Sequence, residues 1–346
     1  MKPVNLKTRS KGALRRCLEG IPFLRVVGIT AATEGADFIV RVRAKDRTWR
    51  LLVEVKPSGQ PRSLREAAGE MRAWLAARPG AYGVLVAPYV SPDGARACQE
   101  AGLGYADLAG NCRLGFGTVF VEKQGRPNPF PARRGLLSIY RPKAAMILRA
   151  LLADPKRRWK MQGLAAEARV SLGHVANVKR ALLEREWAVA GPEGVRLARP
   201  DALLAEWAEN YDLRQREARD YYCLDGPAEA EARLPAAVGR RGGRAALTGF
   251  SAAVRMAPFV RYQRAMAYLT GDEEAVARDL ELKKVDSGAN VTLLIPADEG
   301  VFYGAIEIEG VPVVSPIQAY LDLATVRGRG EEAAQALLDK VIRPNW

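Results

Sequence analysis

The sequence predicts an α/β protein of three domains: a mixed-sheet N-terminal domain, a small helical domain with a β-hairpin in the middle, and an α+β C-terminal domain. Three observations predict this. The 346 residues exceed what a single ordinary core encloses. Strand-type runs alternate with helix-type runs in the first third of the chain. Residues 125–131 hold three prolines and a glycine, which no helix or central strand can cross. We therefore expect domains at residues 1–125, 142–199 and 200–346, with a linker at residues 126–141.

Secondary-structure signals in the N-terminal domain begin with a strand hairpin and continue with alternating helices and strands. The run from Asp37 alternates as Phe38, Val40 and Val42, which is typical of a strand with one buried face. This order predicts a mixed sheet with helices on its faces. A polar turn at residues 107–111 is expected to place Asn111 at an unusual backbone angle. We expect helices at residues 12–19, 64–77 and 91–100, and strands at residues 25–30, 37–44, 49–56, 82–87, 104–108 and 119–121.

The middle domain shows the order helix, helix, tight turn, helix, hairpin within sixty residues. We expect its helices at residues 143–154, 160–168 and 172–186, with Ser171 as the N-cap of the third. Val175, Val178 and Leu182 fall on one face of that helix, and a strand-turn-strand pattern at residues 187–197 follows it. This is the winged helix-turn-helix pattern, and residues 170–182 resemble bacterial regulators. A bare three-helix bundle with the same apolar spacing is the alternative.

Positive charge is concentrated in the first two domains and counts against that alternative. Residues 1–129 carry 21 Lys or Arg against 11 Asp or Glu, a net +10, and residues 130–200 carry 15 against 5, again +10. Residues 201–346 carry 17 against 23, a net −6, which completes the overall +14. The first two segments therefore suit a polyanion such as nucleic acid, and the last does not.

The exposed face of the third helix is expected to enter the major groove of duplex DNA, which admits one helix. Asn177 can pair with adenine, Arg180 with guanine or phosphate, and His174, the only histidine, with a base or phosphate. Basic side chains near helix ends suit the phosphate backbone. Such binding requires no cofactor. The candidate DNA-binding residues are Ser171, Gly173, His174, Asn177, Lys179, Arg180, Lys143, Lys156, Arg157, Arg158 and Lys160.

In the N-terminal domain, Asp37 opens one expected strand and Glu54-Val55-Lys56 ends the next. This resembles the PD-(D/E)xK nuclease superfamily, which has a restriction-endonuclease-like fold, with Ala36 in place of the usual proline. Residues two apart on a strand project to the same side. Under this resemblance Asp37 and Glu54 are ligands of Mg²⁺, and both act in catalysis together with Lys56. Gln60 and Arg62 follow and are candidates to line the same cleft. The superfamily also contains inactive binding domains, so cleavage stays open.

The C-terminal domain carries no catalytic motif of the common kinds. We expect helices at residues 201–210 and 328–340, strands at residues 291–295 and 311–314, and a loop at residues 248–253 that leads into a helix. Residues 314–333 resemble the C-terminal region of AbiEi-like antitoxins, the repressors of type IV toxin–antitoxin systems. The resemblance implies a DNA-binding repressor whose C-terminal domain has a nucleotidyltransferase-like fold without catalytic residues. The chain departs from that family by its segment 1–125.

The four cysteines, Cys17, Cys98, Cys112 and Cys223, lie far apart and form no C-x-x-C pair. With one histidine in the chain this excludes structural zinc, and we expect reduced thiols in a cytoplasmic protein. A signal peptide would have an apolar segment after its basic N-terminus, and this sequence has none there. No stretch approaches the roughly 18 apolar residues that span a membrane.

Three functions follow from these features. The first is a sequence-specific DNA-binding regulator with an accessory N-terminal domain. The second is a Mg²⁺-dependent endonuclease that the winged helix targets to DNA, and the third is an interaction protein whose acidic C-terminal domain recruits a partner. We favour the regulator and leave enzymatic activity open. Duplex DNA is the expected partner, and a homodimer is expected because such regulators meet two half-sites.

Overall fold

The computed structural model describes residues 3–32, 35–130, 139–211, 217–257 and 262–346, so residues 131–138 of the expected linker lie outside the described part. The backbone divides into two compact units. One comprises Met1–Leu137 with Arg180–Glu186, and the other Ser138–Lys179 with Trp187–Trp346. Most of the expected middle domain and the whole expected C-terminal domain therefore belong to one unit.

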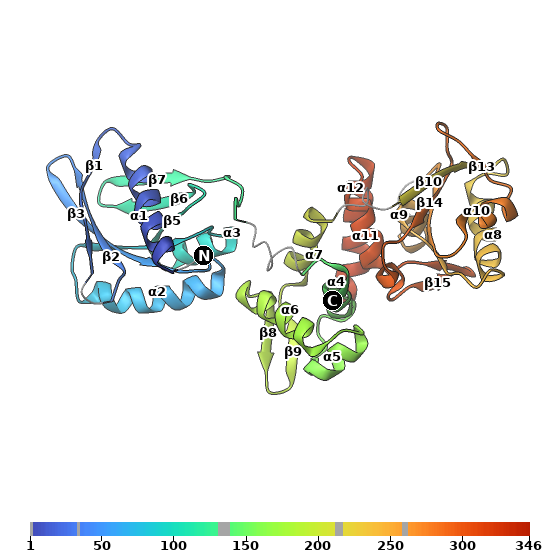
Figure 1. The fold of residues 1–346 in the computed structure, drawn as a ribbon, viewed down its shortest axis with the longest axis horizontal. Helices are drawn as coiled ribbons and strands as arrows, with labels where there is room; N and C mark the ends of the chain where they lie inside the picture. The colour runs from blue at the N-terminus through green and yellow to red at the C-terminus, as the bar shows by residue number, and fades with distance from the viewer. Residues whose placement is uncertain (1–2, 33–34, 131–138, 212–216, 258–261) are drawn as a thin grey trace. The chain divides into compact units, whose positions relative to one another are not determined.

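The N-terminal unit, whose sheet and helices are blue to blue-green in Figure 1, is built on a seven-stranded sheet. The strands of this sheet follow chain order from edge to edge. The first three strands and the last three pair antiparallel, and the third, fourth and fifth pair parallel. The mixed sheet expected from the sequence is thus observed. Its elements are α1 (Pro3–Glu19), β1 (Leu24–Ala31), β2 (Phe38–Ala44), β3 (Arg47–Val55), α2 (Pro61–Ala76), β4 (Ala81–Ala87), α3 (Pro92–Glu100), β5 (Gly104–Asp107), β6 (Cys112–Phe116) and β7 (Val119–Lys123).

Helices cover both faces of this sheet because its strands carry apolar side chains on both sides. Leu14 and Leu18 of α1 pack with Phe38 and alternate residues of β2 and β3 on one face. Leu64 and Met71 of α2 pack with the opposite residues of β3 to β5, together with α3. Burial of these two apolar layers is what holds the sheet between its helices.

Two expectations for this unit were wrong, and one strand was not predicted. Helix α1 begins at Pro3 rather than at residue 12, because its buried face is set by Leu6, Ser10 and Leu14 at four-residue spacing, and the polar Ser10 hides that pattern. In the polar turn it is Gly110, not Asn111, that has a positive φ, of 99°. Strand β6 was not predicted from the sequence.

The cysteines differ from expectation as well. Cys17 of α1 and Cys112 of β6 are joined in a disulfide across 95 residues of sequence, which corrects the expectation of reduced thiols for this pair. The sheet brings the two together, and their separation along the chain gives no sign of it. Cys98 and Cys223 are free and buried.

The second unit begins with two helices, most of a third, and a two-stranded hairpin. They are α4 (Pro142–Ala153), α5 (Met161–Glu167), α6 (Leu172–Glu184), β8 (Ala188–Gly191) and β9 (Gly194–Leu197). An isolated bridge between Trp159 and Val195 adds a short third segment beside the hairpin. Val175, Val178 and Leu182 of α6 are buried, as their spacing predicts.

The rest of the second unit, coloured yellow to red in Figure 1, is a mixed sheet flanked by helices. Its seven strands follow the order β13-β10-β14-β12-β11-β16-β15. Strand β12 pairs parallel with β14, and β11 pairs parallel with β16. The elements are α7 (Pro200–Glu209), β10 (Glu217–Tyr222), α8 (Pro227–Gly239), β11 (Ala245–Leu247), α9 (Gly249–Met256), β12 (Ala265–Leu269), α10 (Glu273–Asp279), β13 (Lys283–Lys284), β14 (Val291–Ile295), η2 (Glu299–Phe302), β15 (Ile306–Ile308), β16 (Val311–Val313), α11 (Pro316–Ala324), α12 (Arg329–Leu337), η3 (Leu338–Ile342) and η4 (Arg343–Asn345).

Polar contacts join the three-helix region to the C-terminal sheet domain within this unit. The Tyr303 hydroxyl donates to Glu167 of α5 at 2.7 Å, and the indole N–H of Trp346 donates to the carbonyl of Leu152 at 2.9 Å. In the described part of the chain, no helix has the length and apolar character that crossing a lipid bilayer requires.

Candidate nucleic-acid interface

The turn between α5 and α6 is fixed by its own backbone. Arg169 has a φ of 51°, a left-handed conformation that reverses the chain after α5. The amide of Val170 donates to the carbonyl of Ala165 at 3.0 Å, which closes the end of α5. Because the reversal takes so few residues, α6 starts immediately after α5, as in a helix-turn-helix.

Ser171 begins α6 and also holds His174. Its hydroxyl accepts from the backbone amide of His174 at 3.4 Å, the geometry of an N-cap. The same hydroxyl lies 2.8 Å from Nδ1 of the His174 ring. Both side chains are exposed. The imidazole is therefore held at the solvent-facing start of the helix, with its other nitrogen directed away from this contact.

An open cleft of about 390 Å³ lies beside this turn. Four polar residues line it, from the start of α4, the turn and the start of α6: Lys143, Arg169, Ser171 and His174. The start of a helix carries unpaired backbone amides and the positive end of the helix dipole, which favour a phosphate. Two cationic side chains at the same place add to that preference. Lys143, Ser171 and His174 were expected from the sequence, and Arg169 was not.

The exposed face of α6 continues from this cleft. Gly173, Ala176, Asn177 and Arg180 are exposed, and Lys179 is half-buried. Leu172, at the first turn, leaves 49% of its surface exposed. A helix with a buried apolar face and this outward face has the form that fits a major groove.

The hairpin after α6 is tied to the segment before α5. The Lys160 ammonium donates to the carbonyl of Pro192 at 2.7 Å, and Arg158 forms an exposed ion pair with Glu193 at 3.2 Å. Arg157 lies over the ring of Trp159 at 3.7 Å. Lys160 and Arg158 of the candidate set therefore contact the hairpin, whereas Arg157 packs on the segment before α5 and Lys156 is exposed.

The second candidate cluster lies at one end of β2 and β3 in the N-terminal unit. One oxygen of Asp37 accepts from the Val55 amide at 2.7 Å, and the other pairs with Lys7 at 2.6 Å. Glu54 pairs with Lys56 at 2.5 Å, and Lys56 also reaches Glu70 of α2. Glu54 and Lys56 thus lie together as expected.

Glu54 has the most perturbed environment in this cluster. Burial raises the pKa of its carboxyl, against the opposing effect of Lys56. Its Oε2 is buried and has no hydrogen-bond partner. In such an environment the carboxyl is costly to ionise. Carboxyls with a raised pKa are often found in functional sites.

The cluster does not form a ready Mg²⁺ site. Both oxygens of Asp37 are already bonded, one to a lysine, and Glu54 is paired with another lysine. Across the described residues, no group of three His, Cys, Asp or Glu side chains is placed to hold a metal ion. Mg²⁺ requires several available oxygen ligands, so these residues do not fit the ion as they stand.

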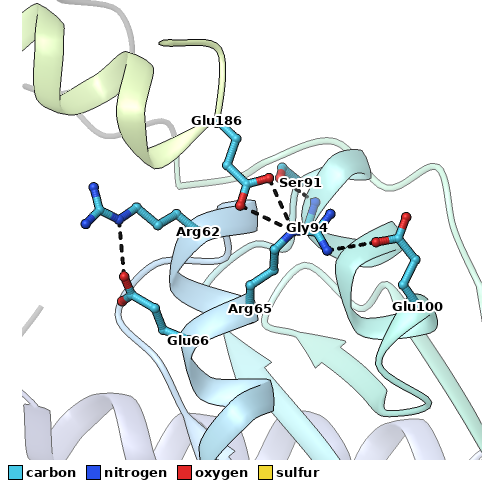
Figure 2. Close-up of polar contacts among 7 residues, drawn as sticks. All are labelled: Arg62, Arg65, Glu66, Ser91, Gly94, Glu100 and Glu186. Carbon is cyan, nitrogen blue, oxygen red and sulfur yellow. Dashed lines mark hydrogen bonds and ion pairs between the residues drawn. The ribbon is translucent and has the colours of Figure 1, made fainter. Parts of the chain in front are cut away.

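The other expected residues near the cluster belong to α2 and to the turn after β5. Gln60 is the N-cap residue of α2, and Arg62 pairs with Glu66 one turn along that helix (Figure 2). Asp107 is buried, and its carboxylate accepts from the amides of Val90, Gly110 and Asn111 and from the Asn111 side chain. A carboxylate so fully bonded stabilises the turn after β5.

Comparison with known proteins finds a family similarity in the C-terminal region. Residues 196–343 match the family model described as "Transcriptional regulator, AbiEi antitoxin, Type IV TA system". The match confirms the AbiEi-like resemblance for this region, and it spans the whole C-terminal sheet from β10 to β16. No curated protein and no solved structure matches the chain.

Proposed function

We propose that the protein is a transcriptional regulator that binds duplex DNA through α4, α5, α6 and the following hairpin, acting as a winged helix-turn-helix. The observation that carries the proposal is the cleft at the start of α6, which Lys143, Arg169 and His174 line together. Phosphate contacts at such a place fix the orientation of a protein on DNA, and the helix beside them reads the bases.

Within this proposal, different residues of the motif contact the DNA backbone and the bases. Lys143, Arg169 and the α6 amides hold a backbone phosphate, while His174, Asn177 and Arg180 face the major groove. The hairpin, held by Lys160 and Arg158, acts as the wing along the backbone. DNA binding of this kind requires no cofactor, and a homodimer would place two such units on two half-sites.

The family match supports a regulatory role. The family described as transcriptional regulators and antitoxins covers residues 196–343, and in the same compact unit these residues follow the three-helix region directly. We infer that the protein represses transcription, and that an antitoxin role in a type IV system is the regulation it serves.

Selection of binding sites from a random duplex pool by the full-length protein tests this proposal. The wild-type protein is expected to enrich a defined sequence, and Asn177→Ala is expected to lose discrimination at one base pair by about 1–3 kcal/mol. Gln335→Ala, on the exposed face of α12, is the matched control and should enrich the wild-type sequence. If the wild-type protein enriched no sequence, the regulator proposal would be wrong.

The alternative function is a PD-(D/E)xK endonuclease, and the buried, unbonded Oε2 of Glu54 favours it. Supercoiled DNA incubated with the full-length protein and Mg²⁺ tests it. Cleavage that is lost in Lys56→Ala but kept in Lys45→Ala, a lysine of the exposed β2–β3 turn, would establish the nuclease. Intact DNA with undiminished binding would exclude it. Because Asp37 and Glu54 are already paired with lysines, these residues do not fit Mg²⁺ as they stand, and we favour DNA binding without cleavage.

A further inference from the structure

An arginine-lined sheet face lies in the N-terminal unit, toward the end of β2 and β3 opposite to Asp37 and Glu54. Alternation puts Arg41 and Arg43 of β2 on the same side, away from the core residues Val40 and Val42. The strand register places Arg43 opposite Arg25 of β1, and Arg41 opposite Arg50 of β3. The four exposed arginines of this face are Arg25, Arg41, Arg43 and Arg50.

A glycine on the neighbouring strand lets the Arg41 side chain lie across the sheet. Gly28 of β1 stands opposite Arg41 in the register. A Cβ at Gly28 would lie 3.2 Å from a guanidinium nitrogen of Arg41, so that side chain extends across β1 over the glycine. The guanidinium groups are thus spread over three adjacent strands and remain open to solvent.

None of the four arginines has an ion-pair partner in the described structure, unlike Arg15, Arg62 and Arg65 of the same unit. Arg62 pairs with Glu66 and Arg65 with Glu100 on the α2–α3 side (Figure 2). Arg15 of α1 likewise pairs with Glu19. The charge of those arginines is already offset within the protein, and the charge of the sheet face is not.

The arrangement of this face opposes folding. Like charges directly opposite each other on paired strands destabilise a sheet, and here two such pairs lie side by side, Arg25 with Arg43 and Arg41 with Arg50. An anionic ligand across the strands would offset that repulsion. Guanidinium groups bind phosphate oxygens through paired N–H donors, a geometry that lysine lacks.

We propose that this sheet face binds the phosphate backbone of duplex DNA as a second, sequence-independent contact. The choice of DNA as the polyanion rests on the proposed function. The side chains between the arginines, Thr30, Ile39 and Thr48, offer no bidentate amide for reading a base. The face therefore adds affinity to any duplex and leaves the choice of sequence to α6.

The test is the salt dependence of binding to a random duplex, measured by fluorescence anisotropy with the full-length protein. Each phosphate contact contributes about −0.9 to the slope of log affinity against log salt, so Arg41→Ala with Arg43→Ala should make the slope shallower by about 1.8. Arg25→Ala with Arg50→Ala, on the two flanking strands, should give the same change. Arg15→Ala with Arg62→Ala removes two paired charges and should leave the slope unchanged.

The outcomes separate this surface from the winged helix. Alanine substitution of the sheet-face arginines should reduce affinity for a selected and a scrambled duplex by the same factor. Asn177→Ala should reduce affinity for the selected duplex alone. A wild-type slope in both sheet-face variants would overturn the second surface and leave the winged helix intact. If polyglutamate displaced the labelled duplex as effectively as unlabelled duplex does, the recognition of phosphate would be overturned. The urea midpoint of both variants should equal or exceed that of the wild type, because repulsion is removed.

Discussion

A guanidinium nitrogen of Arg149 in α4 donates to the amide oxygen of Gln318 in α11 at 2.6 Å. Both side chains are buried, with 4% and 1% of their surface exposed. The amide nitrogen of Gln318 in turn donates to the Tyr211 hydroxyl and to the buried carboxylate of Asp322. The first helix of the proposed DNA-binding motif and the core of the C-terminal domain therefore share one buried polar network.

Gln318→Ala is expected to lower the free energy of unfolding by about 2–3 kcal/mol, because it removes a buried amide that bonds Arg149, Tyr211 and Asp322. Urea denaturation measures the change. Gln335→Ala is the control, since this glutamine bonds to Asp339 on the exposed surface and its loss should cost much less. Equal effects from the two substitutions would show that the contact with Arg149 contributes nothing.

Substitution of Ser171 is expected to separate capping from the positioning of His174. Ser171→Ala loses the cap of α6 and about 1 kcal/mol of stability, whereas Ser171→Gly loses only a few tenths. Both remove the hydroxyl that lies 2.8 Å from Nδ1 of His174, so both should weaken DNA binding. Urea denaturation and anisotropy titration measure the two effects. Wild-type affinity in Ser171→Gly would refute a role for the held imidazole.

The two glycines of the wing predict opposite responses to alanine. Gly194 has a φ of 131°, and a Cβ there would lie 2.4 Å from the carbonyl oxygen of Trp159. Gly191→Ala meets nothing within 4 Å. We expect Gly194→Ala to lower the thermal midpoint and the affinity for duplex DNA, because strain displaces the hairpin. Gly191→Ala is the matched control, and identical behaviour of both would mean that the hairpin is not part of the interface.

Glu54 predicts a defined pH dependence of stability. Burial raises the pKa of this carboxyl in the folded chain above its ordinary value of 4.5, so the folded state binds the proton more tightly. The contribution of Glu54 to stability is therefore present below pH 4.5 and is lost as the pH rises through the folded pKa. As the pH rises through the folded pKa, the free energy of unfolding of Glu54→Gln should increase relative to that of the wild type. Glu70→Gln, which changes an exposed residue of α2, is the comparison. Urea denaturation at a series of pH values measures it, and a constant difference would contradict the raised pKa.

Much of the fold could be predicted because local pattern and burial agree. Strand β14 (Val291–Ile295) follows from an apolar run rich in β-branched residues, and the core face of α6 follows from apolar spacing. Strands β10 and β12 were not predicted. The first is rich in charged residues, and the second is a short, fully apolar run without alternation, so neither shows a strand period.

The candidate site was predicted in part for a similar reason. The N-cap role of Ser171 is local and was expected. Arg169 became a candidate only when the turn placed it beside Lys143, a residue 26 positions earlier in the chain. Lys160, expected to contact phosphate, instead holds the Pro192 carbonyl of the wing, a contact that depends on how the hairpin folds back.

Photocrosslinking from the outward face of α6 tests the central claim most directly. Ala176 is exposed and lies between the buried Val175 and the exposed Asn177, so a photoreactive phenylalanine analogue there leaves the core intact. The full-length protein carrying it should form a covalent adduct with duplex DNA on irradiation, and the same analogue at Gln335 of α12 should not. A protein that binds the duplex but forms no adduct from position 176 would contradict recognition through α6.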